Sequence, residues 1–167
     1  MAKLEILRYP DKRLRNKALP VTEFDASLRT LCENMAETMY AESGIGLAAP
    51  QLGLTKRITV IDVSADRSEL IEFINPEITW DDGEVDSEEG CLSIPEFRET
   101  IQRREEVPVQ AVDRHGESFE VKADELLSIC LQHEIDHLNG VLFIDKLSRL
   151  KKEIFKKWHK KRARGGE

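Results

Sequence analysis

Residues 132–140 read QHEIDHLNG, and this short stretch constrains the fold more than any other part of the 167-residue chain. Side chains four residues apart lie on the same face of a helix. His133 and His137 can therefore bind one metal ion together, with Glu134 beside it as a base. The same face is otherwise apolar, so the helix must turn its histidines toward the interior. The predicted stripe consists of Leu126, Ile129, Cys130, His133 and His137.

A third ligand must come from elsewhere, because a catalytic site of this kind uses three protein ligands and one water. The candidates are Cys91, Cys130, or a distant carboxylate or histidine. Cys130 would have to reach back over its own helical turn, so we interpret it as a small apolar residue in the packing. His115 and His159 lie in a predicted turn and in a basic tail, where neither is well placed.

Cys91 lies in the segment EEGCLSIPEF and can approach the helix from outside. Gly90 lets the backbone turn tightly there. Pro95 is expected to keep the segment from continuing as a central strand. We therefore predict that Cys91, His133 and His137 are the metal ligands.

Glu134 is the residue of the motif that can act as the base. A thiolate ligand offsets one of the two charges of the metal, so bound water is acidified less and a base matters more. Glu134 would take the proton of the water and later give it to a leaving amine. Attack on a carbonyl also creates an oxyanion, which needs hydrogen-bond donors. The Leu92 N–H, next to Cys91, is one candidate donor.

The segment 44–53, GIGLAAPQLG, is expected to be an apolar loop. Gln51 ends its apolar run and is either a second oxyanion donor or an amide satisfied within the loop. Gly44 and Gly46 would let a peptide backbone approach closely, although glycines there are also compatible with simple turn formation.

Periodicity predicts the remaining elements. A helix capped by Asp25 carries Leu28, Leu31, Cys32, Met35 and Met39 at helical spacing. Strands are predicted at RITVIDV, at LIEFINPEI and within residues 98–112, with turns at DDGE (81–84) and DRHG (113–116). The helix of the histidines runs from about Asp124 to Leu138 and ends at Gly140.

The predicted fold is α+β, with antiparallel β-sheets surrounding a central metal-binding helix, an N-terminal helix and a C-terminal helix. Residues 1–147 would form the catalytic domain, and residues 148–167 a basic C-terminal helix and tail of the same domain. Ser148 is expected to cap that helix, with Leu150, Ile154 and Trp158 as a thin apolar stripe.

Charge and cysteine content bear on partners and compartment. From Lys146 onward the chain has ten lysines and arginines against two acidic residues, whereas the whole chain carries −7. This tail either meets an anionic partner such as nucleic acid or is a solvated helix face. Three cysteines are not a disulfide framework, and the N-terminus resembles no secretory signal. We expect a cytoplasmic protein without a membrane anchor.

Three motifs together resemble the peptide deformylases, of the bacterial type with a C-terminal helix. They are GIGLAAPQ (44–51), EGCLS (89–93) and HEIDH (133–137), in the order and spacing of that family. The resemblance extends over nearly the whole chain and implies hydrolysis of a formyl-methionyl N-terminus to formate and a free amine.

The resemblance also implies roles for individual residues. Gln51 and the Leu92 N–H would stabilise the oxyanion, Glu134 would be the general acid and base, and Glu89 would pair with Arg103. Peptide-binding roles would fall to Gly44, Ile45, Gly46, Gly90 and Arg98, and Ile45, Ile129, Cys130 and the His133 ring would line a methionine pocket.

The cofactor implied by the resemblance is one divalent metal ion, Fe2+ natively, with Ni2+, Co2+ or Zn2+ able to occupy the site. The ligand set itself fits zinc equally well. The basic helix would dock on the ribosome through rRNA phosphates.

Three other interpretations remain. An endoprotease of the zincin kind would share HEIDH, but zincins usually use glutamate or histidine as third ligand. A binding module for RNA or ribosomes with a structural metal would need a fourth protein ligand. A member of the same family could act on another formyl group.

Overall fold

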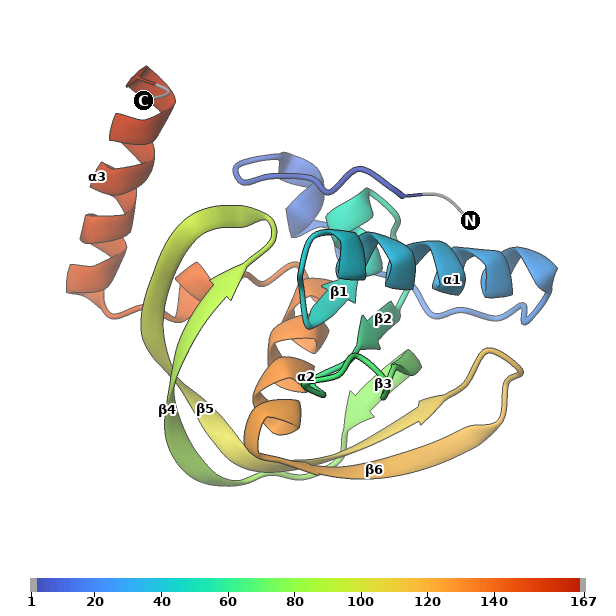
Figure 1. The fold of residues 1–167 in the computed structure, drawn as a ribbon. Coiled ribbons are helices and arrows are strands. Elements are labelled where there is room, and N and C mark those ends of the chain that lie inside the picture. Colours follow the sequence, from blue (N-terminus) through green and yellow to red (C-terminus); the bar gives the residue numbers. More distant parts are fainter. Residues whose placement is uncertain (1–2, 166–167) are drawn as a thin grey trace.

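The computed structural model describes residues 3–165 as an α+β fold in which an antiparallel sheet curves around one helix (Figure 1). Helix α2 (Glu125–Leu138) carries both histidines of the motif and lies at the centre of the molecule. The predicted fold class is confirmed, although the strands form one six-stranded sheet rather than separate sheets. Residues 166 and 167 of the predicted basic tail lie outside the described residues.

One long strand makes the sheet curve. Strand β5 (Ile94–Val112) pairs with β4 (Asp82–Cys91) along its first part, and with both β3 (Ile71–Ile78) and β6 (Ser118–Asp124) along its second part. The short strands β1 (Gly46–Ala48) and β2 (Ile58–Ile61) extend the sheet beyond β3. The sheet order is therefore β1-β2-β3-β5-β4, with β6 also on β5.

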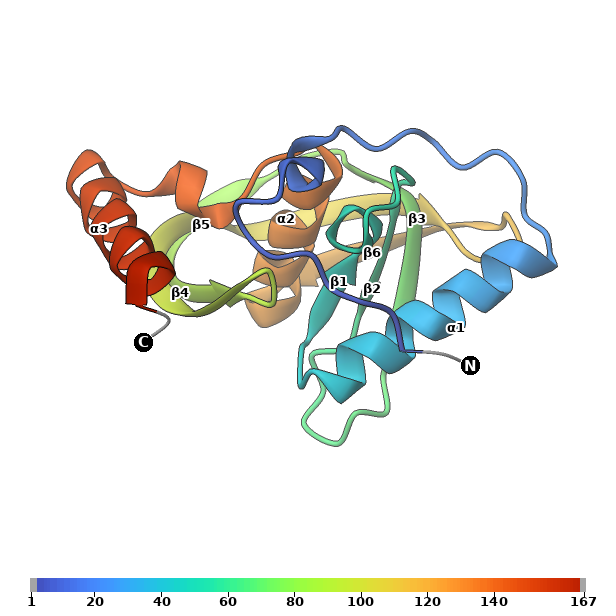
Figure 2. The same cartoon turned by 90° about the horizontal axis from the view of Figure 1, so that it is seen from above.

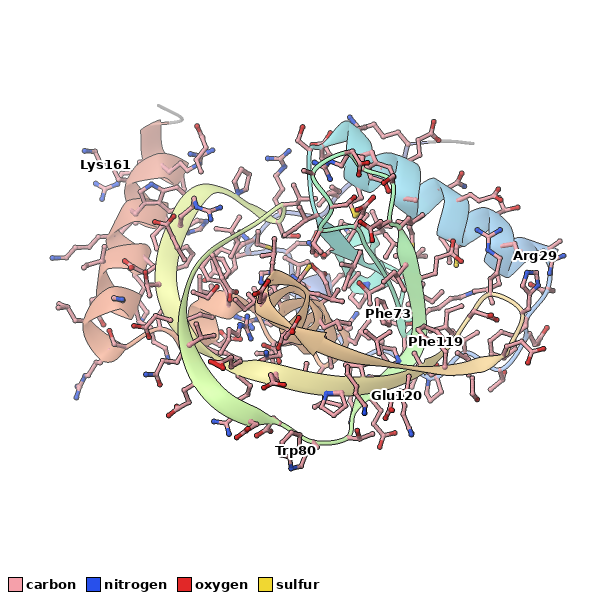
Figure 3. All side chains as sticks on the ribbon, turned by 60° about the horizontal axis from the view of Figure 1, so that its bottom comes forward. Arg29, Phe73, Trp80, Phe119, Glu120 and Lys161 are labelled. Atoms are coloured by element: carbon pink, nitrogen blue, oxygen red, sulfur yellow. The ribbon has the colours of Figure 1, made fainter. Side chains whose placement is uncertain are left out.

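Apolar residues of the curved sheet pack directly on α2. Val107, Val109 and Ala111 alternate along β5, are buried, and share a core cluster with Leu131 of α2. The same cluster contains Phe73 of β3, whose ring lies 5.7 Å from that of Phe119 in β6. Figure 3 labels both residues, which lie close together although β3 and β6 each pair with β5 and not with one another. Burial against the sheet thus positions the histidine-bearing helix.

Helix α1 (Ala26–Ala41) packs on strands β1 and β2 through the apolar face that its periodicity predicts. The Asp25 carboxylate accepts a hydrogen bond from the Leu28 N–H at 3.0 Å, which confirms the predicted N-cap. Cys32, Met35 and Met39 are fully buried against β1 and β2. Burial raises the pKa of Cys32 to about 12, so this thiol is a packing residue.

Three local predictions were wrong, and strand pairing explains each. The expected loop at residues 44–53 contains β1 and the 3-10 helix η2 (Ala49–Leu52). The expected turn at 81–84 falls mostly within β4, because β5 is long enough to pair with Asp82 and Glu84. Pro95 is the second residue of β5, at the start of a strand, where its missing N–H is tolerated.

Helix α3 (Arg149–Gly165) comes directly after the 3-10 turn η3 (Phe143–Lys146), whereas the 3-10 turn η1 (Lys12–Arg15) lies near the start of the chain. Ser148 caps α3 as predicted, since its hydroxyl accepts from the Lys151 N–H at 3.2 Å. The predicted apolar stripe was wrong at two of its three residues: Leu150 is 72% exposed and Ile154 49% exposed, whereas Trp158 packs on the core as predicted. Phe155, which the stripe did not include, is 4% exposed. The buried face lies one position further round the helix.

The view from above places α1 and α3 on opposite sides of the molecule, with α2 between them (Figure 2). Phe155 and Trp158 anchor α3 on Phe97 of β5, with ring centroids 4.8 and 5.1 Å from the Phe97 ring. None of the described helices has the length and apolar character needed to cross a membrane.

Replacing Phe155 with alanine should lower the free energy of unfolding by about 3–5 kcal/mol, because it leaves a cavity in a well-packed cluster. The matched change Leu150→Ala, on the exposed face of the same helix, should cost less than about 0.5 kcal/mol. Urea denaturation of both variants measures the difference. Equal effects would contradict the packing of α3 on its Phe155 face.

Candidate metal centre and substrate cleft

Three potential ligand atoms converge beside α2. Cys91 comes from the last position of β4, whereas His133 and His137 project from successive turns of α2. Their ligand atoms all lie within 4.8 Å of one another. The His137 Nε2 lies 3.2 Å from the His133 Nε2 and 3.4 Å from the Cys91 Sγ. The three residues that the sequence analysis selected are therefore brought together.

These separations fit a small divalent ion. Tetrahedral bonds of the usual zinc lengths place two histidine nitrogens about 3.3 Å apart and a nitrogen and a sulfur about 3.6 Å apart. The observed 3.2 and 3.4 Å are close to both values. Burial lowers the pKa of His137 well below its ordinary value, which favours the neutral imidazole that metals bind. The donor set and its geometry thus fit a metal ion.

A buried ion-pair network holds the His133 ring. The His133 Nδ1 lies 3.0 Å from the Glu89 Oε1. Arg103 donates to both carboxylate oxygens of Glu89 at 2.8 Å and to the Asp136 Oδ2 at 2.7 Å. Burial alone would raise the pKa of Glu89, but the hydrogen bonds from Arg103 and His133 outweigh it and lower that pKa to about 2. An ionised Glu89 orients the imidazole so that Nε2 faces the other ligands.

The expected pairing of Glu89 with Arg103 is confirmed, but the contribution of Asp136 was missed. Asp136 lies between the two histidines of the motif, where the sequence gives no sign of its partner. That partner, Arg103, comes from β5, and only the packing of the strand on α2 brings the two side chains together.

Glu134 is buried beside the ligands, 4% exposed, and its Oε1 has no hydrogen-bond partner among the described residues. Burial raises the pKa of Glu134 to about 7. A β-carbon on Gly46 would come within 2.6 Å of the Glu134 Oε2 and 2.8 Å of the Cys130 Sγ. The glycine therefore makes room for the carboxylate next to β1.

Gln51 is an amide satisfied within the segment, which is one of the two alternatives that its sequence context left open. Its Oε1 accepts from the Ala48 N–H at 2.9 Å, so the amide is satisfied within the segment. Its Nε2 donates to the Ser93 hydroxyl at 3.1 Å and lies 3.6 Å from the Cys91 Sγ. A fixed N–H group is thus held at the edge of the ligand cluster.

A cleft of about 620 Å3 opens onto these residues. It is bounded on one side by the segment before β1 and on the other by β4 and the start of β5. All the predicted peptide-binding residues line it, namely Gly44, Ile45, Gly46, Gly90, Arg98, Ile129 and Cys130.

The predicted interior stripe of α2 needs correction at Leu126, which is 46% exposed and lines the cleft instead of the core. Ile129 is half-buried and lines the cleft, where the family resemblance placed it. The apolar stripe of α2 is therefore divided between packing and the cleft wall. Phe97 and Arg8 also line the cleft and were not identified from the sequence. Arg8 lies almost at the N-terminus, and no local pattern connects it with the motifs.

A cluster of cysteine and two histidines, a buried glutamate and an adjoining cleft make up the kind of site used by metal-dependent hydrolases. Comparison with known proteins narrows this class. Residues 3–153 match the family model described as polypeptide deformylase. The chain is 51% identical over 164 residues to a peptide deformylase of Tolumonas auensis, covering 98% of both chains.

Two further relatives support the same family assignment. A peptide deformylase of Hahella chejuensis is 52% identical and covers 98% of this chain and all of its own length. The crystal structure of a peptide deformylase from Legionella pneumophila superposes with a TM-score of 0.89 at 49% identity, covering 97% of this chain and 98% of that one. The chain belongs to the polypeptide deformylase family.

Replacing Arg103 with alanine should lower the free energy of unfolding by about 3–5 kcal/mol, because the buried Glu89 carboxylate loses its two-pronged cationic partner. Glu89 then keeps only its contact with His133, and Asp136 only a 3.8 Å contact with Lys146. Denaturation curves measure this loss. Arg103→Lys is the matched control: it keeps one charge but not the two-pronged contact, and should fall between alanine and the wild type. An alanine variant as stable as the wild type would contradict the bracing role.

Proposed function

We propose that this deformylase hydrolyses the formyl-methionyl N-terminus of newly synthesised polypeptides at the Cys91, His133 and His137 site. The observation that carries the proposal is the convergence of three ligand atoms with the buried Glu134 at a cleft. When bound there, a divalent metal ion supplies a Lewis acid and an acidified water.

Glu134 performs the proton transfers of the reaction. Its carboxylate accepts a proton from the attacking water, whose oxygen forms a bond to the formyl carbon. Glu134 then gives this proton to the methionine nitrogen as the C–N bond breaks, which releases formate and a free amine. The raised pKa of Glu134, about 7, suits a group that must both accept and donate a proton near neutral pH.

The Gln51 amide and the Leu92 N–H are proposed to stabilise the oxyanion that forms on the carbonyl. Gln51 is suited to this because its Oε1 bond to the Ala48 N–H prevents the amide from rotating. A preorganised donor of this kind is worth about 10²–10³ in kcat.

The substrate backbone is proposed to add as an extra strand between β1 and β4. Strand β1 pairs with β2 along one edge, and its remaining edge adjoins the cleft together with Gly90 of β4. Ile45, Gly46 and Gly90 would bond to the peptide backbone.

The side chains of the cleft would then select methionine. Ile45, Ile129, Cys130 and the His133 ring form a mainly apolar pocket, with Gly44 beside it. Arg98 is 60% exposed on its side chain and would contact the peptide beyond the methionine.

Fe2+ is the proposed native ion, with Ni2+, Co2+ or Zn2+ as replacements in a purified sample. One thiolate and two imidazoles suit all of these metals. A thiolate next to iron would also make the enzyme sensitive to oxygen, since the thiolate itself oxidises.

The test is formate release from formyl-Met-Ala-Ser by protein purified without oxygen and loaded with Fe2+ or Ni2+. Glu134→Gln keeps the size of the side chain but removes the base, so kcat should fall about 10²–10⁴-fold. Metal analysis of the variant should still find one ion per chain. Removing the metal with a chelator should abolish formate release, and adding it back should restore it.

The same assay separates the other interpretations. Cleaved peptide bonds without formate would support an endoprotease. Bound metal with neither product would leave a binding module or a different formyl substrate. Full activity in Glu134→Gln would contradict the proposed proton transfers.

We also propose that α3 docks the enzyme on the ribosome, in the cytoplasm where formylated chains are made. Its outward face is strongly basic, and Lys161 extends from its outer side in Figure 3. Exposed lysines on this face would neutralise rRNA phosphates.

Four exposed lysines of α3 should carry this binding: Lys152, Lys156, Lys160 and Lys161. Changing them to glutamine should weaken sedimentation with ribosomes at low salt by about tenfold or more and reduce the salt dependence. The matched control changes four exposed lysines elsewhere, Lys12, Lys17, Lys56 and Lys122. Equal loss in both variants would argue for non-specific charge attraction, and no loss in either would contradict docking through α3.

A further inference from the structure

The segment that leads into β1 is held by a loop that no motif includes. The Gly44 carbonyl accepts a hydrogen bond of 2.6 Å from the Arg67 Nη1. The next carbonyl, that of Ile45, accepts one of 2.9 Å from the Asp62 N–H. Residues 62–70 connect β2 to β3, so this loop holds two residues of the cleft wall, Gly44 and Ile45, from behind.

The loop is built around one buried carboxylate. Asp62 is fully buried, and its Oδ2 accepts from the Tyr40 hydroxyl at 2.7 Å. Its Oδ1 accepts from both the backbone N–H and the hydroxyl of Ser64, and its Oδ2 also accepts from the Glu69 N–H at 3.3 Å. Both ends of the loop are therefore tied to the same side chain.

Arg67 is placed by this framework. Its backbone has φ of +59°, a left-handed conformation that a non-glycine residue rarely adopts, at the turn that aims the side chain. The guanidinium lies over the Tyr40 ring, 5.6 Å from its centroid. Tyr40 thus contacts Arg67 with its face and Asp62 with its hydroxyl, and the three side chains form one unit.

The segment that this unit holds needs support. Strand β1 has three residues and pairs only with β2 among the described strands, so few ladder bonds order it. Ser43, just before it, has φ of +58°, which marks a sharp change of chain direction. A backbone that must pair with a substrate strand loses affinity if it is first disordered, because ordering it opposes binding.

We propose that Arg67 is a positioning residue for the substrate, which holds residues 44–46 in the geometry that pairs with the peptide backbone. The inference rests on the proposed function and extends it to a residue that touches neither the metal ligands nor the reacting atoms. Arg67 acts on peptide binding and not on the chemical step.

The test compares Arg67→Met, which keeps the apolar stem without donors, with Arg67→Lys, which keeps one charged donor. For formyl-Met-Ala-Ser, the methionine variant should raise KM about tenfold, the usual effect of losing one charge-assisted hydrogen bond, with kcat changed less than twofold. For formyl-methionine amide, which offers fewer backbone groups to residues 44–46, the loss in kcat/KM should be smaller. The lysine variant should recover most of the loss.

Two further measurements make the result independent of turnover. Amide hydrogen exchange at Ile45 and Gly46 should be faster in Arg67→Met than in the wild type, while the melting temperature stays the same. Arg29→Met, a matched change at the distant end of α1 (Figure 3), should alter neither exchange nor KM.

Equal loss for the two substrates, a fall in kcat at constant KM, or unchanged exchange at residues 45 and 46 would overturn the positioning role. Absence of formate release by the wild type from either substrate would overturn the proposed function itself, and the present inference with it. A kinetic defect confined to the variant leaves the proposed function intact.

Discussion

The buried contact of Arg103 with Glu89 and Asp136 is the interaction on which the site depends. It joins β5, β4 and α2, the elements that carry or support all three ligands. An unpaired charge in this position would be strongly unfavourable, so each member requires the others. The network fixes the His133 ring through Glu89, and it fixes the end of β4 where Cys91 lies. The arrangement of the three candidate ligands is thus a consequence of charge pairing between sheet and helix.

The ligands could be predicted from the sequence because their constraints are local. Helical spacing places His133 and His137 together, and Gly90 beside Cys91 indicates a tight approach. The start of β4 could not be predicted in the same way. Asp82 looks like a turn residue, and only pairing with Glu106, far along the chain, makes it part of a strand.

The error in the predicted apolar stripe of α3 has a similar cause. Leu150, Ile154 and Trp158 have helical spacing, but so do Phe155 and Trp158, which form the buried face. Which face is buried depends on the aromatic cluster that Phe97 contributes from β5, and this is tertiary information. Hydrophobic period identifies a helix but leaves its rotation open when polar residues separate the apolar ones. In α3, the packing of Phe155 and Trp158 on Phe97 decides which face of the helix is buried.

The glycines of the first motif show the same division between local and long-range causes. Their sequence context suggests freedom of the backbone, which is the usual reason for glycine in a turn. At Gly46 the reason is space: a β-carbon would overlap Glu134, which lies 88 residues later in the numbering of the chain. The buried carboxylate can sit against β1 only because that position lacks a side chain. The first and third motifs are therefore coupled by contact, so Glu134, the proposed base, and the cleft wall at β1 are parts of a single packed unit.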